Sequence, residues 1–99
     1  PDSMRIFEEE ILSQLPDHYT SQQALIKDIA KVHGELLFIH PFREGNGRTS
    51  RILANLMARK QGYPGLNFKR IDFNEYIIAV QQVARKDYSR MEQIIAYTF

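Results

Sequence analysis

One stretch of this chain, residues 40–51, carries most of the side chains that could do chemistry. It reads His-Pro-Phe-Arg-Glu-Gly-Asn-Gly-Arg-Thr-Ser-Arg. The stretch contains a histidine, one carboxylate, two glycines on either side of an asparagine, and two arginines three residues apart. Together these groups could bind a metal-bound polyphosphate and remove a proton from a nucleophile.

The second half of the stretch has the residue types of an anion site. Gly45 and Gly47 lack a Cβ, so their backbone N–H groups can approach a ligand closely and form a nest. Asn46 lies between them and can donate from its side-chain amide. Arg48 and Arg51 would share one face of the first turn of a helix, where two guanidinium groups suit phosphate oxygens. We therefore expect a site for more than one phosphate.

Three residues in the first half add further roles. Glu44 would repel phosphates unless a cation lay between them, and Mg²⁺ typically takes one or two carboxylates together with phosphate oxygens. Glu44 therefore indicates a metal and a nucleotide-like substrate. His40 stands before a proline, at the end of a rigid element, and could act as a general base. Phe42 is assigned to the core as the anchor of the loop.

Each of these features also has an ordinary structural explanation. A histidine before a proline is more often a cap or a core residue, and two helical arginines more often form surface salt bridges. Their joint occurrence within one short stretch favours the chemical interpretation. His33 lies on the same helix side as His40 and could suggest zinc, but a zinc site normally needs further close ligands. We expect His33 to be packed or capping, and His18 to be solvated in a turn.

The elements around this stretch are predicted to be helices. Apolar residues recur at helical spacing, no alternation typical of strands occurs, and three capping boxes mark helix starts. These boxes are Thr20 with Gln23, Asp72 with Glu75, and Ser89 with Glu92. We expect an all-α, single-domain bundle of about five helices, with the active-site loop between the long central helix and the next one. The helices are predicted over about 3–15, over 21–39, from about 47 to 61, from about 73 and from about 90.

The apolar spacing also predicts the buried faces. The helix over 21–39 should be central, because its apolar stripe is wide enough to be contacted from several sides. The stripe consists of Leu25, Ile29, Val32, Leu36 and Ile39, widened by Ile26, Leu37 and Phe38. The helix after the motif is expected to bury Ile52, Leu53, Leu56 and Met57.

Composition narrows the possible functions. The chain has 99 residues, which suits one domain, and a formal net charge of +1, which favours neither nucleic acid nor an anionic membrane. It contains no cysteine, so thiolate metal sites and a cysteine nucleophile are excluded. No secretory signal or membrane-spanning run is present, and we expect a cytoplasmic protein. Because the chain begins at Pro1 without a methionine, we expect a piece of a longer protein.

At residues 40–51 the sequence resembles the Fic family. The family motif is His-Pro-Phe-x-Asp/Glu-Gly-Asn-Gly-Arg-x-x-Arg, and every fixed position matches. The helices predicted on both sides agree, so the resemblance covers roughly residues 3–97, and we expect residues 1–99 to be a Fic domain core. The related Doc proteins have a lysine where this chain has Gly47, which disfavours a Doc-type kinase.

The resemblance implies a protein adenylyltransferase, which transfers AMP from ATP to a Ser, Thr or Tyr hydroxyl of a target protein. His40 would be the catalytic base and Glu44 would hold Mg²⁺. The phosphates would be bound by Gly45, Asn46, Gly47, Arg48 and Arg51, with Phe42 as the structural anchor of the motif.

Two features of the Fic family are not found in this sequence. The β-hairpin flap that docks the target would precede Pro1. The inhibitory motif Ser/Thr-x-x-x-Glu-Gly/Asn is absent, so an inhibitor would lie in another segment or on a separate antitoxin chain. Two alternatives stay open: a Fic enzyme that uses another nucleotide donor, and a catalytically silent nucleotide-binding toxin core or interaction module.

Overall fold

The computed structural model describes residues 15–39 and 46–99 of the chain. These residues form four α-helices and a 3-10 turn without any strand, which confirms the all-α prediction. They are α2 (Gln22–Ile39), α3 (Asn46–Lys60), η2 (Phe68–Arg70), α4 (Phe73–Val83) and α5 (Ser89–Thr98). The helix predicted over about 3–15 lies outside the described residues. Within the described ranges, no helix is long and apolar enough to cross a membrane.

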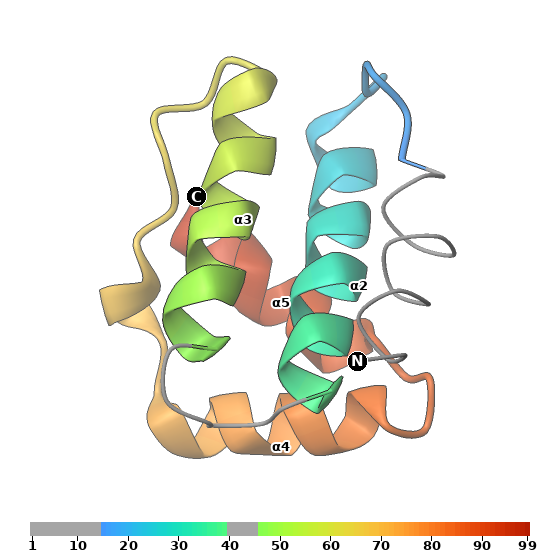
Figure 1. Cartoon of the computed structure of the whole chain (residues 1–99), viewed down its shortest axis with the longest axis vertical. Coiled ribbons are helices and arrows are strands. Elements are labelled where there is room, and N and C mark those ends of the chain that lie inside the picture. Colours follow the sequence, from blue (N-terminus) through green and yellow to red (C-terminus); the bar gives the residue numbers. More distant parts are fainter. Residues whose placement is uncertain (1–14, 40–45) are drawn as a thin grey trace.

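Helix α2 is central, as its wide apolar stripe predicted, and packs against α3, α4 and α5. Helices α2 and α3 run side by side, and α5 lies behind them (Figure 1). Helix α4 crosses the end of the molecule where α2 stops and α3 starts (Figure 1). The motif follows α2 directly in the sequence and its second half forms the start of α3, so α4 lies at the motif end of the bundle.

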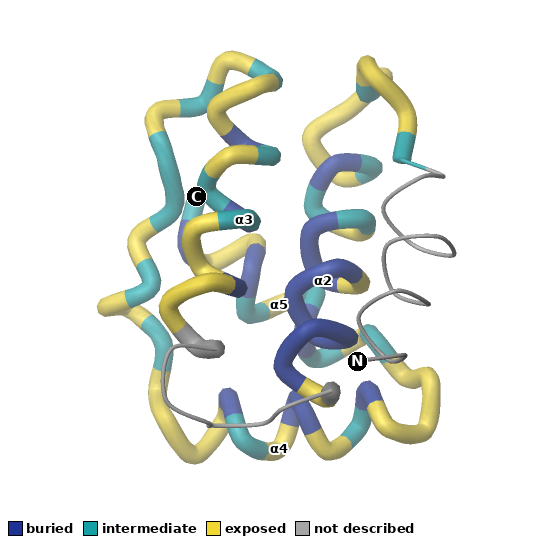
Figure 2. Tube along the Cα trace, in the orientation of Figure 1, coloured by how far each residue is buried: buried dark blue, intermediate teal, exposed yellow. Residues whose placement is uncertain are grey.

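The core gathers along α2, where most residues of the second half are buried (Figure 2). The predicted stripe is confirmed at four positions, Leu25, Ile29, Val32 and Leu36, and Leu37 is buried beside it. Phe38, expected to widen the stripe, is 46% exposed. Position 38 lies seven residues after exposed Lys31, which is two helical turns, so both face solvent.

Helix α3 turns a different face to the core from the one predicted. Ile52 is 52% exposed and Leu56 is 58% exposed, whereas Leu53 and Met57 are partly buried. The fully buried positions carry small side chains spaced four residues apart: Ser50, Ala54 and Ala58. Small residues in one helical row let two helix backbones approach closely. The prediction favoured positions with large apolar side chains, so it overlooked this row of small residues.

Helix α4 begins and helix α3 ends as predicted. Asp72 is the N-cap of α4, and its carboxylate accepts a hydrogen bond from the backbone N–H of Glu75 at 3.1 Å. This bond satisfies one of the unpaired donors of the first turn. At the other boundary, Gly62 follows the end of α3 with a φ of 92°, which only glycine adopts readily.

The other two predicted capping boxes are wrong in detail. At the start of α2, the hydroxyl of Ser21, not that of Thr20, accepts from the backbone N–H of Ala24 at 3.1 Å. Either hydroxyl is a competent cap, so the sequence pattern does not choose between adjacent residues. Ser89 is the first residue of α5 rather than its cap, and its N–H donates to the carboxylate of Asp87 at 3.1 Å.

Two contacts fix α4 and its following turn against α2. Gly34 of α2 lies so close to α4 that a Cβ there would stand 2.7 Å from Cγ2 of Val83. One residue later, the buried carboxylate of Glu35 accepts hydrogen bonds from Nζ of Lys86 at 2.8 Å and from the hydroxyl of Tyr88. Burial, with the hydrogen bond to Glu35, raises the pKa of Tyr88. These contacts position α4 across the motif end of the bundle.

Candidate functional site

The motif residues that the structure describes form the first turns of α3. Helix α3 begins at Asn46, one or two residues before the predicted start, so Asn46 and Gly47 open the helix and Arg48 follows. Arg48 and Arg51 are both exposed to solvent. Four predicted site residues lie outside the described residues, and their roles stay predictions: His40, Phe42, Glu44 and Gly45.

This part of α3 has the electrostatic character of an anion site. The first turn of a helix presents unpaired N–H groups and the positive end of the helix dipole. The first turn of α3 contains no acidic residue, while Arg48 and Arg51 add two positive charges there. Their three-residue spacing keeps the two side chains on neighbouring positions of the helix surface. Phosphate oxygens are the ligands that such a group of donors suits best.

A buried histidine lies directly behind this turn. His33 of α2 is only 1% exposed, and its ring stacks on Tyr76 of α4, with 5.7 Å between ring centroids. Its Nδ1 lies 3.1 Å from the backbone carbonyl oxygen of Ser50, and its Nε2 is hydrogen-bonded to the hydroxyl of Tyr76. The imidazole therefore joins three helices at the motif end of the bundle, and the prediction that His33 is packed is confirmed.

The partners of His33 determine its tautomer. A carbonyl oxygen only accepts, so Nδ1 carries the proton that it donates to Ser50, and Nε2 accepts from the hydroxyl of Tyr76. Burial lowers the pKa of His33 from 6.5 to about 4; the bond to Ser50 opposes this shift, and the charge of Arg51 adds to it. The ring is therefore neutral at physiological pH, as this hydrogen-bond pattern requires.

The charge of Arg51 influences this buried pair. Burial raises the pKa of the Tyr76 hydroxyl, and Arg51 acts in the opposite direction. The same positive charge lowers the pKa of His33. The second motif arginine thus affects two buried groups that the motif does not include.

Sequence patterns predicted only that His33 is packed or capping, and they assigned Tyr76 no role at the site. One signal was available, because a buried tyrosine hydroxyl nearly always finds a hydrogen-bond partner. The partner itself could not be deduced, since Tyr76 and His33 are 43 positions apart.

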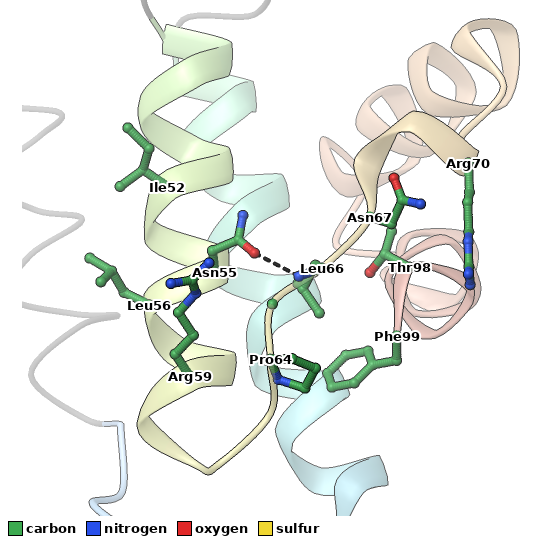
Figure 3. A pocket seen from close by; sticks show the side chains of 11 residues that line it. Ile52, Asn55, Leu56, Arg59, Pro64, Leu66, Asn67, Arg70, Thr98 and Phe99 are labelled. Atoms are coloured by element: carbon green, nitrogen blue, oxygen red, sulfur yellow. Dashed lines mark hydrogen bonds between the residues drawn. The ribbon is translucent and has the colours of Figure 1, made fainter.

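A pocket lies along the exposed side of α3, where Ile52, Asn55, Leu56 and Arg59 line it. It has a volume of about 640 Å³ and is lined by α3, by residues 64–67 and by the end of α5 (Figure 3). The side-chain oxygen of Asn55 accepts from the backbone N–H of Leu66 at 2.6 Å and fixes the connecting segment to α3 (Figure 3). The pocket predicted over residues 40–51 involves residues that are not described, so that expectation is untested.

The described residues also bear on the zinc alternative at His33. Within the described ranges, no three His, Asp or Glu side chains are grouped so that they could hold a metal ion. Both ring nitrogens of His33 are already engaged by Ser50 and Tyr76. His33 is therefore a structural histidine.

Fold and site together define a compact helical domain with two exposed arginines in the first turns of one helix, supported from behind by buried polar groups. The chain belongs to the Fic/DOC family, because the profile of that family matches residues 1–58, which include the whole motif.

Individual relatives agree with the family assignment. The chain is similar to a protein adenylyltransferase Fic of Aedes aegypti, with 34% identity over 93 residues that cover 86% of this chain and 19% of the relative. It is 40% identical to protein adenylyltransferase fic-1 of Caenorhabditis elegans over 55 residues, which cover 56% of this chain and 11% of the relative. The chain thus spans less than a fifth of the length of these relatives. No solved structure gives a significant match.

Proposed function

We propose that residues 1–99 are the core of a Fic domain that transfers AMP from ATP to a hydroxyl group of a target protein. The observation that carries the proposal is the family membership over the complete motif, together with relatives named protein adenylyltransferases. The position of Arg48 and Arg51 at the start of α3 supports it, because both guanidinium groups are exposed where phosphates would bind.

In the proposed reaction, the target hydroxyl oxygen attacks the α-phosphorus of ATP. The new bond joins that oxygen to the α-phosphorus, and the bond from the α-phosphorus to the bridging oxygen breaks, so pyrophosphate leaves. His40 accepts the proton of the hydroxyl as general base. The phosphate oxygens are bound by Arg48, Arg51 and the N–H groups of Gly45, Asn46 and Gly47, which stabilise the developing negative charge.

Glu44 is proposed as the ligand of Mg²⁺. A single carboxylate that shares the ion with phosphate oxygens and water is the donor set that Mg²⁺ usually takes beside a nucleotide. When bound, Mg²⁺ supplies charge neutralisation between the carboxylate and the phosphates. Phe42 is proposed to anchor the motif in the core.

The test is a transfer assay with two labels. The chain is incubated with cell lysate, Mg²⁺ and ATP that carries label at either the α- or the γ-phosphate, and His40→Ala is assayed in parallel. We expect the α label alone to appear on protein and to be lost in His40→Ala. Transfer of the γ label would mean a kinase and would refute the proposal.

A result in which neither label is transferred would support a different function. If neither label is transferred but ATP still binds, the chain is a nucleotide-binding module rather than a transferase. Repeating the α-label assay with GTP, CTP and UTP tests the alternative that another nucleotide is the donor.

A further inference from the structure

Positive charge is concentrated in one part of this nearly neutral chain. Residues 45–71 contain no Asp or Glu but six Lys and Arg residues, whereas the whole chain has a formal net charge of only +1. Two of the six are the motif arginines. Two others, Arg59 and Arg70, are exposed and line the pocket beside α3, termed the α3 groove. Arg59 follows Arg51 by eight residues, which is more than two helical turns, so its charge lies beyond the motif.

The walls of the α3 groove are fixed by the backbone. Helix α3 forms one side, and the non-helical residues 64–67 form the other, with the end of α5 beside them (Figure 3). Gly65 has a φ of 127°, and a Cβ there would stand 3.2 Å from Oδ1 of Asn55 and 3.4 Å from Nη2 of Arg59. Glycine therefore lets the segment pass close to the Arg59 guanidinium, and the bond from Leu66 to Asn55 holds the segment there.

The lining of the groove combines apolar and cationic side chains. Leu56 is 58% exposed and Ile52 is 52% exposed, which makes them the most exposed aliphatic side chains among the described residues. They are four positions apart and share one helix face. Within the part of the chain that the structure describes, no carboxylate lines the groove and none pairs with Arg59 or Arg70. Arg70 donates only to the backbone carbonyl oxygen of Tyr97, at 3.4 Å.

We propose that the α3 groove is a docking site for a segment of a partner protein that carries both carboxylate and large apolar side chains. The apolar side chains of the partner cover Ile52 and Leu56, and its carboxylates pair with Arg59 and Arg70. The charge of the groove fits an acidic partner, and its aliphatic side chains favour a peptide over a nucleic acid, whose phosphates gain nothing from aliphatic contacts. The inference does not depend on the proposed transfer of AMP.

The test begins with a phage-displayed library of random peptides, which is selected for binding to this chain. We expect the selected peptides to be enriched in Asp and Glu together with Leu, Ile or Phe. The tightest of them is then titrated into the ¹⁵N-labelled chain. The backbone N–H resonances of Leu66 and Asn67 should shift, whereas that of Lys27, an exposed residue of α2 outside the groove, should not.

Matched variants separate the contribution of charge from that of apolar contact. Arg59→Gln and Arg70→Gln should each weaken binding of this peptide about fivefold, the effect of one hydrogen bond, and added salt should weaken it in the unchanged chain. Arg85→Gln, at an exposed position after α4, should bind normally. Leu56→Ser should weaken binding about tenfold, because the peptide covers the exposed part of that side chain, whereas Ile78→Ser, on exposed Ile78 of α4, should have no effect.

Several outcomes would overturn the inference. They are a selection without acidic enrichment or without any binder, resonance shifts outside the groove, and equal affinities for Arg59→Gln and Arg85→Gln. A single-stranded RNA that displaces the peptide would make the groove a nucleic-acid surface. If sedimentation shows that the chain self-associates and that Leu56→Ser prevents this, the groove is an interface between two copies. None of these outcomes bears on AMP transfer, which the two-label assay tests separately.

Discussion

The buried, neutral His33 should make the stability of this domain depend on pH below neutrality. In the folded chain its pKa is lowered from 6.5 to about 4, with burial as the main cause. Between pH 6.5 and about 4, the unfolded chain binds a proton at His33 that the folded chain does not bind. The contribution of His33 to the free energy of unfolding is therefore fully present above pH 6.5 and is lost as the pH falls toward 4. Below that pH the histidine is protonated in both states.

The size of this effect follows from the same two values. The difference between 6.5 and about 4, at ~1.36 kcal/mol per pKa unit, corresponds to about 3 kcal/mol of unfolding free energy. A domain of this size typically has a total stability of about 5–15 kcal/mol, so the loss is a large fraction. Tyr76, whose hydroxyl is bonded to the imidazole, stays neutral through this range because its pKa is raised.

The assay is urea unfolding followed by circular dichroism at pH 7, 5.5, 4.5 and 4. The unchanged chain is compared with His33→Gln, which cannot titrate, and with His18→Gln, which removes an exposed histidine from a turn. Carboxylates contribute to all three curves and cancel in the comparison. We expect His33→Gln to lose about 3 kcal/mol less between pH 7 and 4 than the other two. Parallel curves for all three proteins would refute a buried neutral His33.

A second measurement covers the case in which His33→Gln does not fold. The ring resonances of His33 in the unchanged folded chain should not shift between pH 8 and 5, because the neutral form persists throughout. A midpoint near 6.5 in that titration would contradict the prediction directly.

Two further predictions concern packing and capping. Gly34→Ala should destabilise the domain by about 1–3 kcal/mol in urea unfolding, because the new methyl group would collide with Val83. Adding Val83→Ala to this variant should restore part of the lost stability. If it restores none, the strain does not come from Val83. Asp72→Ala should cost about 1 kcal/mol of unfolding free energy and lower Tm by roughly 4–8 °C in calorimetry, because it removes the N-cap of α4. Asp72→Asn should cost less, since asparagine can also cap. Equal losses of stability for both variants would argue against the cap.

Local signals predicted most of the described architecture. The wide apolar stripe of α2 identified the central helix, because a helix contacted from several sides must be apolar over much of its surface. Asp72 and Gly62 marked helix boundaries correctly, since a cap and a left-handed turn depend on a few adjacent residues.

The failures occurred where the decisive interaction is tertiary. The buried face of α3 is set by Ser50, Ala54 and Ala58, whose small size matters only against the close surface of α2. A prediction from hydrophobicity favours Ile52 and Leu56 instead, and these prove to be exposed. The cap of α2 was misplaced by one residue because neighbouring Thr and Ser hydroxyls are chemically equivalent for this purpose.

The same reasoning applies to the site. A motif describes residues that are adjacent in sequence, and it identified Arg51 but not the buried groups near it. Tyr76 comes from α4, which packs closely against α2 at Gly34 and Val83. His33 bonds to Tyr76 and to the Ser50 carbonyl, so it links the start of α3 to the core. Removing the imidazole of His33 should therefore break both bonds, whereas removing only the Tyr76 hydroxyl breaks one and should spare most of the packing. The difference in unfolding free energy between His33→Gln and Tyr76→Phe then measures how much of this link depends on the imidazole.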